Sequence, residues 1–183
     1  MTHGCSVGLY YLSSALQLVL WVDPLMFIQP VKFPMPTIIR TNSDNPHFIE
    51  LVKLLDADLA EKDGAEHSFY AQYNTITKIK HVVIAYENSQ PVGCGAIKEY
   101  SEAAMEVKRM YTLPAYRGKG IAGHILWELE NWAAELLYKK CILETGKRQP
   151  DAIGLYKKNG YQPIPNYGQY VGIDNSVCFE KKL

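Results

Sequence analysis

The chain has 183 residues, of which 48% are apolar and 21% are charged, a balance typical of a globular protein and not of a disordered one. Its 19 Lys and Arg residues match its 19 Asp and Glu residues, so the formal net charge at pH 7 is zero. We therefore predict no nucleic-acid partner, because a bulk nucleic-acid binder needs surplus basic side chains to displace counterions from phosphates. The 4 cysteines form no CxxC pair and no cluster with zinc spacing, which indicates no metal site and a reducing, cytoplasmic compartment.

Residues 1–34 differ in composition from the rest of the chain. Asp23 is the single charged side chain of residues 1–31, and the mostly apolar stretch 7–22 is shorter than the roughly 20 residues that cross a bilayer. No Lys or Arg precedes this stretch, as a secretory signal would require. Three interpretations stay open: an extension outside the folded domain, an apolar segment packed on the domain or on a partner, and a membrane or export signal. We predict one folded domain over 35–183, with no membrane contact of its own.

The elements expected from 35 to 183 are mixed strands and helices. A β-rich run predicts a first strand at 37–40, and Asn45 followed by Pro46 supplies the capping side chain and the proline that begin a helix. Apolar residues spaced by four, three and four carry that helix to Asp63 and Gly64. We expect further strands at 81–87, 91–99, 104–112, 140–145 and 177–180, and further helices at 120–138 and 150–158. The order predicts a mixed α/β layer fold that contains an antiparallel meander.

The stretch 110–122 carries the strongest chemical signal. A strand ends there, a glycine-bearing loop follows, and a long amphipathic helix begins. The first turn of a helix presents unpaired backbone N–H groups and a positive dipole end, and Gly118 and Gly120 allow a ligand to approach the backbone closely. With Arg117 and Lys119 adding charge, the stretch favours an anion, above all a pyrophosphate. A tight strand-to-helix connection with solvated basic residues stays open as the alternative.

Two motifs resemble those of the GNAT superfamily of N-acetyltransferases. The run Arg117-Gly118-Lys119-Gly120-Ile121-Ala122 is similar to the family's R/Q-x-x-G-x-G/A signature, and residues 151–161 resemble its A-x-x-L/F-Y-x-x-x-G-F segment. One helix and one strand separate the two motifs, as in the family, and the resemblance spans 37–183. It implies the acyl-CoA N-acyltransferase fold, a mixed α/β (α+β) architecture whose mostly antiparallel sheet has helices on both faces. It also implies an acyltransferase that uses acetyl-CoA.

The resemblance also assigns roles to individual residues. Backbone amides of the loop and of the first helical turn would hold the pyrophosphate of coenzyme A. The residues concerned are Arg117, Gly118, Lys119, Gly120, Ile121 and Ala122. Met110, Tyr111 and Thr112 would line the pantetheine arm where the family's fourth strand splays from the fifth, and a main-chain N–H near Met110 would polarise the thioester oxygen.

Two residues match catalytic positions of the family. Tyr156 corresponds to the tyrosine near the coenzyme A sulfur, and Glu106 corresponds to the general base of histone-type members. We place Glu106 on the same strand face as Met110. Each has a structural alternative: Tyr156 would only pack in the core, and Glu106 would pair on the surface with Lys108 or Arg109.

The acceptor is expected to meet the cofactor between residues 48–73 and 163–170. Candidate acceptor-binding residues are Phe69, Tyr70, Tyr73, Glu144, Tyr167 and Tyr170. The acceptor amine stays open between a small molecule, a peptide N-terminus and a lysine, and it would attack directly in a ternary complex. The alternative function is a non-catalytic acyl-CoA-binding or sensing module of the same fold. Pairing of two protomers into a homodimer also stays open.

Overall fold

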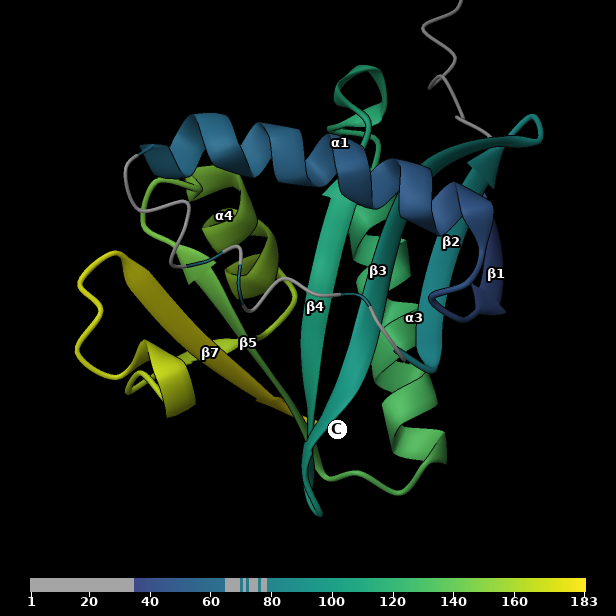
Figure 1. The fold of residues 1–183 in the computed structure, drawn as a ribbon. Coiled ribbons are helices and arrows are strands. Elements are labelled where there is room, and N and C mark those ends of the chain that lie inside the picture. The colour runs from purple at the N-terminus through teal and green to yellow at the C-terminus, as the bar shows by residue number, and fades with distance from the viewer. Residues whose placement is uncertain (1–34, 65–69, 71, 73–75, 77–78) are drawn as a thin grey trace, which may run out of the picture. The chain divides into compact units, whose positions relative to one another are not determined.

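The computed structural model describes residues 35–64, 70, 72, 76 and 79–183. The predictions for residues 1–34 and for Phe69 and Tyr73 lie outside these described residues. The strands are β1 (Thr37–Thr41), β2 (His81–Glu87), β3 (Gln90–Ser101), β4 (Ala104–Thr112), β5 (Lys140–Gly146), β6 (Gln162–Ile164) and β7 (Ser176–Lys182). They form a 7-stranded sheet in the order β1-β2-β3-β4-β5-β7-β6 (Figure 1).

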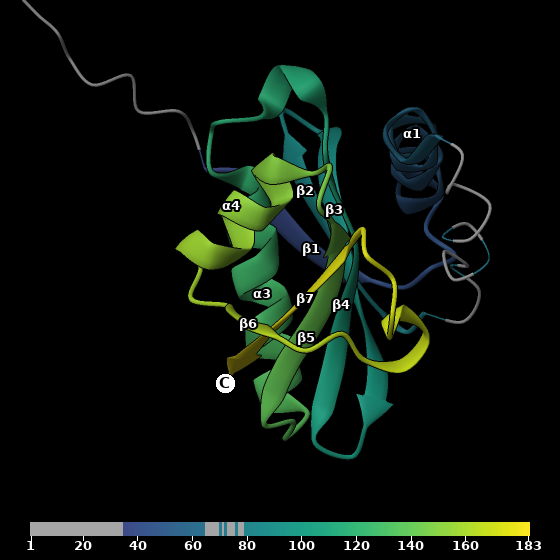
Figure 2. The ribbon, with the colours of Figure 1, turned by 90° about the vertical axis from the view of Figure 1, so that its left-hand side faces the viewer.

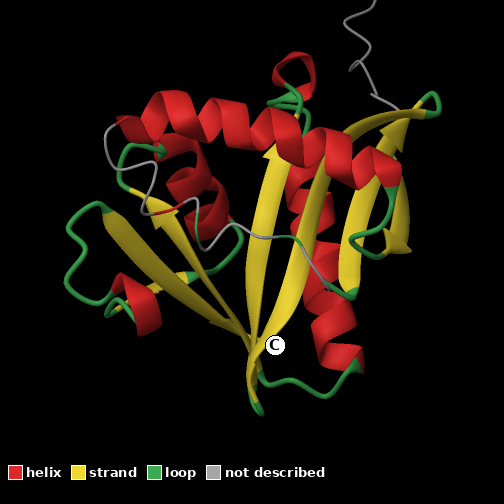
Figure 3. Cartoon of the chain, viewed as in Figure 1, coloured by secondary structure: helices red, strands yellow, loops and turns green. Residues whose placement is uncertain are grey.

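Neighbouring strands pair antiparallel throughout this sheet except for β4 and β5, which pair parallel. The six predicted strands are all present as β1 to β5 and β7. The edge strand β6 was not predicted, because Pro163 at its centre cannot donate to a ladder and is tolerated only at a sheet edge. The expected mixed α/β fold with a mostly antiparallel sheet is confirmed, as Figure 3 shows.

Helices cover both faces of the sheet (Figure 2). The helix α1 (Pro46–Asp63) packs on one face, and α3 (Ile121–Glu135) and α4 (Pro150–Lys158) pack on the other. Successive side chains of a strand point to opposite faces, so Val82 and Ile84 join the α1 core while Val83 and Ala85 join the α3 core. Burial on both faces explains why β2 is an almost continuous apolar run.

The ends of the helices follow from local chemistry. The Asn45 side chain accepts a hydrogen bond of 2.9 Å from the backbone N–H of His47 at the start of α1, and Gly64 ends that helix with a φ of 55°. The start and end predicted for α1 are therefore confirmed. The predicted end of α3 at residue 138 is wrong, because Leu137 has a φ of 69° and a left-handed residue cannot continue an α-helix.

The strands β4 and β5 pair over a short length and then diverge. Their parallel register joins Ala104 to Lys140 and ends at Glu106 and Ile142. Beyond these residues β4 pairs with β3 and β5 pairs with β7. Figure 1 shows the two strands opening into a V below α1. The backbone edges that face each other across the V have no strand partner there, so their N–H and C=O groups are available to a ligand.

A β-bulge in β4 interrupts the alternation of its side chains. Arg109 has a φ of 58°, and the register between β3 and β4 shifts beside it. Val107 lies in the core under α3, so Glu106 points to the opposite face of the sheet. Met110 nevertheless packs on the α3 side, because the bulge adds one residue between them. The prediction that Glu106 and Met110 share a face is therefore wrong.

The described residues contain free thiols, and they hold neither a metal-binding cluster nor a helix that could span a membrane. Cys94, Cys141 and Cys178 are buried and carry free thiols. Burial raises the pKa of Cys178 to about 11, so that side chain stays a neutral thiol at physiological pH. Among the described residues, no cluster of His, Cys, Asp and Glu has the arrangement of a metal site. None of the helices in the described ranges combines the length and apolar character needed to span a membrane.

The contact between β3 and α3 generates a stability prediction. A Cβ placed on Gly95 would overlap the Met110 side chain and would lie 2.8 Å from Ile125 Cγ2 and 2.9 Å from Leu129 Cδ1. Gly95→Ala should lower the free energy of unfolding by about 1–3 kcal/mol, because the close-packed core must shift to admit the methyl group. Urea denaturation measures this. The matched control is Gly154→Ala in α4, where a Cβ meets no atom within 4 Å, and it should stabilise by about 0.5–1 kcal/mol. Equal effects of the two substitutions would contradict the predicted packing.

Candidate active site

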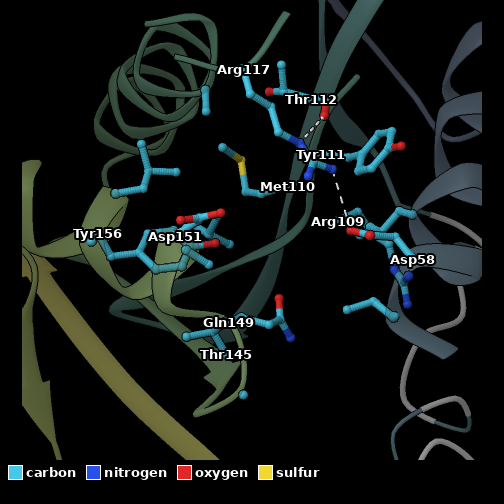
Figure 4. Close-up of a pocket in the computed structure, with 18 of the residues that line it drawn as sticks. Asp58, Arg109, Met110, Tyr111, Thr112, Arg117, Thr145, Gln149, Asp151 and Tyr156 are labelled. Carbon is cyan, nitrogen blue, oxygen red and sulfur yellow. Dashed lines mark hydrogen bonds and ion pairs between the residues drawn. The ribbon is translucent and has the colours of Figure 1, made fainter. Parts of the chain in front are cut away.

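A cavity of about 750 Å³ lies where β4 and β5 diverge (Figure 4). Residues 106–112 of β4 line its length. The loop before α3 and the first turn of that helix close one part of it, and the start of α4 closes another. Residues of α1 and of the end of β5, together with Tyr70 and Tyr170, complete the lining. The cavity therefore joins the loop motif and the α4 motif, which are separated in the sequence by a helix and a strand.

The loop before α3 keeps its backbone open to this cavity. Gly118 and Gly120 have φ values of 77° and 82°, which only glycine adopts without strain. No side chain caps the N-terminus of α3, so the amides of its first turn keep their unpaired N–H groups. A Cβ on either glycine would meet no atom within 4 Å. The space in front of this helix end is therefore free for an anion, as the sequence predicts.

The basic residues of the loop are held within the protein. Arg117 Nε donates a hydrogen bond of 3.0 Å to the carbonyl of Thr112, and Arg117 Nη2 lies 3.5 Å from Asp58 of α1. Figure 4 shows Arg117 bridging the cavity from the loop towards α1. Lys119 Nζ lies 4.6 Å from the centre of the Tyr116 ring and outside the cavity lining. Lys119 is the one residue of the six predicted for the pyrophosphate that does not line the cavity. The other five do: Arg117, Gly118, Gly120, Ile121 and Ala122.

The three residues predicted for the pantetheine arm also line the cavity, but they face different sides of the sheet. Met110 packs against the α3 core, whereas Tyr111 belongs to the α1 core. Thr112 lies at the end of β4 and its carbonyl holds Arg117. A ligand in the gap between β4 and β5 would therefore contact side chains from both layers.

Tyr156 projects from α4 into the cavity and is almost completely buried. Its ring makes aromatic contacts with Tyr161 at 5.7 Å and with Phe179 at 6.3 Å between ring centres. Burial raises the pKa of Tyr156 above the ordinary phenol value, and the nearby carboxylate of Glu144 raises it further. Its hydroxyl is therefore protonated at physiological pH and can donate a hydrogen bond to a group in the cavity. Tyr156 therefore both packs in the core and lines the cavity.

Glu106 is a buried carboxylate with a partner on each oxygen. Tyr167 donates a hydrogen bond of 3.1 Å to Oε1, and Lys108 Nζ lies 3.2 Å from Oε2. The ion pair with Lys108 foreseen as the structural alternative exists, but it is buried and not on the surface: the two side chains are 10% and 12% exposed. Burial, and then the charge of Glu106, raise the pKa of the Tyr167 hydroxyl, which stays protonated and keeps donating.

A second carboxylate is fixed on the other side of the gap. Glu144 of β5 accepts a hydrogen bond of 2.6 Å from the Ser176 hydroxyl, which in turn lies 3.2 Å from the Tyr70 hydroxyl. Glu144, Tyr70 and Tyr170 line the cavity. Burial raises the pKa of Tyr170, and the charges of the Glu144 and Glu106 carboxylates raise it further. Of the predicted acceptor-binding residues, Tyr167 reaches the cavity only through Glu106.

Several lining residues have charges that the sequence analysis did not assign to the site, among them Arg109 and Asp58. Arg109 was considered only as a surface partner of Glu106, but it is buried and lines the cavity. Asp58 of α1 holds Arg117 and Lys62 at the cavity edge. Strand alternation gave no signal for Arg109, because the bulge that turns it inward depends on pairing with β3.

Comparisons with known proteins agree with this geometry. Residues 48–161 match the family model described as the acetyltransferase (GNAT) family. An IAA acetyltransferase of Azospirillum brasilense is 32% identical over 152 residues, which cover 82% of this chain and 99% of that protein. A Klebsiella pneumoniae structure assigned as an acyl-CoA N-acyltransferase superposes with a TM-score of 0.69 and 30% identity, covering 81% of this chain and 98% of that one. A GNAT family acetyltransferase of Elizabethkingia anophelis, solved with acetyl-CoA bound, has a TM-score of 0.61, 18% identity and coverages of 82% and 100%.

The hydrogen bond between Tyr167 and Glu106 can be tested without a substrate. Tyr167→Phe should lower the free energy of unfolding by about 1.5 kcal/mol, because it leaves one oxygen of a buried carboxylate without its donor. Tyr100→Phe is the matched control: its ring contacts that of Tyr167 at 5.0 Å between centres, but its side chain is exposed. That control should change stability by less than about 0.5 kcal/mol in the same denaturant titration. Equal losses in both variants would contradict a specific contribution of the hydrogen bond to Glu106, because both substitutions keep the ring and remove only a hydroxyl.

Proposed function

This chain belongs to the acetyltransferase (GNAT) family and is an acyltransferase, and we propose that it transfers an acetyl group from acetyl-CoA to a primary amine. One observation carries the proposal: the uncapped N-terminus of α3 opens on a cavity that continues between two diverging strands to Tyr156. An anion-binding helix end and a protonated phenol in one cavity suit a ligand with a diphosphate and a leaving sulfur. The acceptor is a small-molecule amine, a peptide N-terminus or a lysine.

The residues of the loop fit the diphosphate of coenzyme A. Gly118 and Gly120 leave open space before the helix end, and the amides of Ile121 and Ala122 belong to the uncapped first turn. Arg117 lies at the edge of the same cavity and adds positive charge. The gap between β4 and β5 would hold the pantetheine arm, whose amides can pair with the free backbone edges of the two strands.

The two residues to which we assign catalytic roles, Glu106 and Tyr156, line the same cavity. When bound, acetyl-CoA supplies a thioester whose acyl carbon the amine attacks and whose sulfur departs. The amine must first lose a proton, because it is mostly ammonium at pH 7, and we assign this proton to the carboxylate of Glu106. A main-chain N–H near Met110 donates to the acyl oxygen, and preplaced donors of this kind contribute several kcal/mol in such sites.

Tyr156 acts on the departing sulfur as a hydrogen-bond donor. A phenol with a raised pKa is a weaker acid than a thiol, for which the ordinary pKa is about 8.5, so full transfer of its proton to a thiolate is unfavourable. Donation of a hydrogen bond to the developing negative charge needs no such transfer and is available at every physiological pH. We therefore assign Tyr156 the role of stabilising the leaving group. The ammonium proton that Glu106 receives passes on to solvent. The nitrogen loses a second proton once the acyl–nitrogen bond has formed, and this proton reaches the departing sulfur through solvent, so that a thiol and one proton are released.

The acceptor side of the cavity is built from residues of β4, β5, the segment after α1 and the C-terminal segment. Glu144, Tyr70 and Tyr170 line it, and Tyr167 supports it through Glu106. We propose that the amine enters there, with coenzyme A on the side of α3. A cytoplasmic location is proposed as well, supported by the free buried thiols, and a homodimer stays a prediction from the sequence.

The glycine loop provides the first test of this function. Gly120→Ala should raise the dissociation constant of coenzyme A at least about tenfold, or about 1.4 kcal/mol, because the methyl group enters the space of the diphosphate and strains the loop. Isothermal calorimetry measures this. Gly172→Ala is the matched control: it has a φ of 78° and open space, but it lies outside the cavity lining. Both variants lose similar stability, so unchanged coenzyme A affinity in Gly120→Ala would remove the loop from the binding site.

The role of Tyr156 is separable from its packing. Tyr156→Phe keeps the ring and removes the hydroxyl, so kcat should fall by about 100-fold while KM for acetyl-CoA changes little. The neighbouring Tyr161→Phe serves as the control, because its ring touches that of Tyr156 at 5.7 Å between centres but does not line the cavity. Release of free thiol at saturating substrates measures both variants. A wild-type kcat for Tyr156→Phe would show that this residue only packs.

A further inference from the structure

Arg109 is a buried cation with half of its guanidinium unpaired. Its side chain is 1% exposed, and its Nη1 donates a hydrogen bond of 2.6 Å to Asp56 of α1. Its Nη2 is also buried but has no hydrogen-bond partner. Arg109 lines the cavity, and Figure 4 shows it beside α1, across the cavity from Tyr156. The two terminal nitrogens of Arg109 are therefore held at the acceptor side of the cavity, and Nη2 makes no hydrogen bond.

An unpaired buried guanidinium nitrogen is costly, so its retention needs a reason. Arginine cannot lose its proton in a protein, and an unsatisfied charged donor carries the full cost of its lost hydration. Asp56 compensates only in part, since its side chain is 46% exposed and approaches from the solvent side. The carboxylate of Glu106 is already engaged by Tyr167 and Lys108. The protein thus offers Arg109 no second partner among its described residues.

We propose that Arg109 binds a carboxylate of the acceptor, so that the substrate is an amine that also carries a carboxylate group. This inference rests on the proposed function and specifies its substrate class. The guanidinium is planar and matches a carboxylate with two parallel N–H donors, which makes it suited to this task. Glu106 and Glu144 would receive the ammonium end of the same molecule, while Arg109 receives its anionic end. The cavity then carries complementary charges for both ends of an amino acid.

The cofactor phosphates are a poorer match for Arg109. The open helix end that suits a diphosphate belongs to α3, which packs on one face of the sheet, whereas Arg109 reaches Asp56 of α1 on the opposite face. Arg117 lies between the two positions and pairs with Asp58 of α1. A purely structural brace between β4 and α1 is also a poorer match, because the bond from Nη1 alone provides that link and Nη2 adds only a cost.

Matched acceptor pairs test the inference on the wild-type enzyme. The common amino acids with a primary amine and their carboxamides differ in the charge of one group and, through it, in the pKa of the α-amine. Free-thiol release therefore gives kcat/KM for each, expressed per unprotonated amine. For the accepted side chains, the carboxylate form should be favoured by about 10- to 100-fold, the range expected for a charged hydrogen bond. Calorimetry with the coenzyme A-saturated protein gives the same comparison as a binding constant, which needs no turnover. Equal or better use of the carboxamides overturns the inference.

Variants then assign the preference to Arg109. Arg109→Met should reduce the ratio of kcat/KM for a carboxylate to kcat/KM for its carboxamide to about one, whereas a merely structural role would lower both values by the same factor and leave the ratio unchanged. Arg109→Lys retains the charge but not the two-donor geometry and should show an intermediate preference. Arg40→Met is the matched control, since this β1 arginine pairs with Glu128 and Glu135 of α3 outside the cavity. If Arg109→Met fails to fold, the Arg109→Lys variant and the wild-type pairs still decide the matter.

Two further sets of measurements distinguish a failure of this inference from a failure of the proposed function, and a free amino acid from a peptide as the source of the carboxylate. Acetylation of amines without a carboxylate preference would overturn the inference and leave the transferase function intact, whereas binding of coenzyme A with no acyl transfer to any amine would overturn the function. Loss of coenzyme A affinity in Arg109→Met, with the carboxylate preference retained, would assign Arg109 to the cofactor site instead. Short peptides whose second residue is Glu or Gln distinguish a peptide carboxylate from that of a free amino acid.

Discussion

The divergence of β4 from β5 is the constraint on which the rest of this site depends. A parallel pair that ends at Glu106 leaves two buried backbone edges without a strand partner, and such edges are stable only where a ligand or water can pair with them. The divergence also makes room for a cavity of about 750 Å³ inside a continuous sheet. Because β5 continues on β7 and β4 continues on β3, both walls of the gap stay rigid while the gap itself is open.

The bulge at Arg109 decides which chemistry each wall presents. One inserted residue keeps Met110 on the α3 side, yet it leaves Arg109 beside α1 among the residues that line the cavity. The loop that follows β4 then delivers Gly118 and Gly120 to the start of α3. The two ends of the cavity thus differ in character, with an anion-binding helix end on one face of the sheet and a mixture of carboxylates and a guanidinium on the other.

Buried polar networks hold the acceptor side in place. Glu106 is fixed by Tyr167 from the C-terminal segment, and Glu144 is fixed by Ser176, which also contacts Tyr70. These contacts join β4, β5, β7 and the segment after α1, so the carboxylates are positioned before any ligand binds. The same burial keeps the tyrosine hydroxyls protonated, because a low-dielectric environment disfavours the phenolate.

The sequence by itself determined most of the elements, the loop motif and the family, but it missed the edge strand β6 and the end of α3. Cap residues such as Asn45, apolar periodicity and the glycines before α3 act locally, so they could be read without a structure. Only the tertiary structure decided that Glu106 and Met110 face opposite layers, that the pair of Glu106 and Lys108 is buried, and that Arg109 lies in the cavity. The reason is physical: a bulge and the divergence of two strands arise from pairing between residues far apart in the chain, and local patterns carry no record of that pairing.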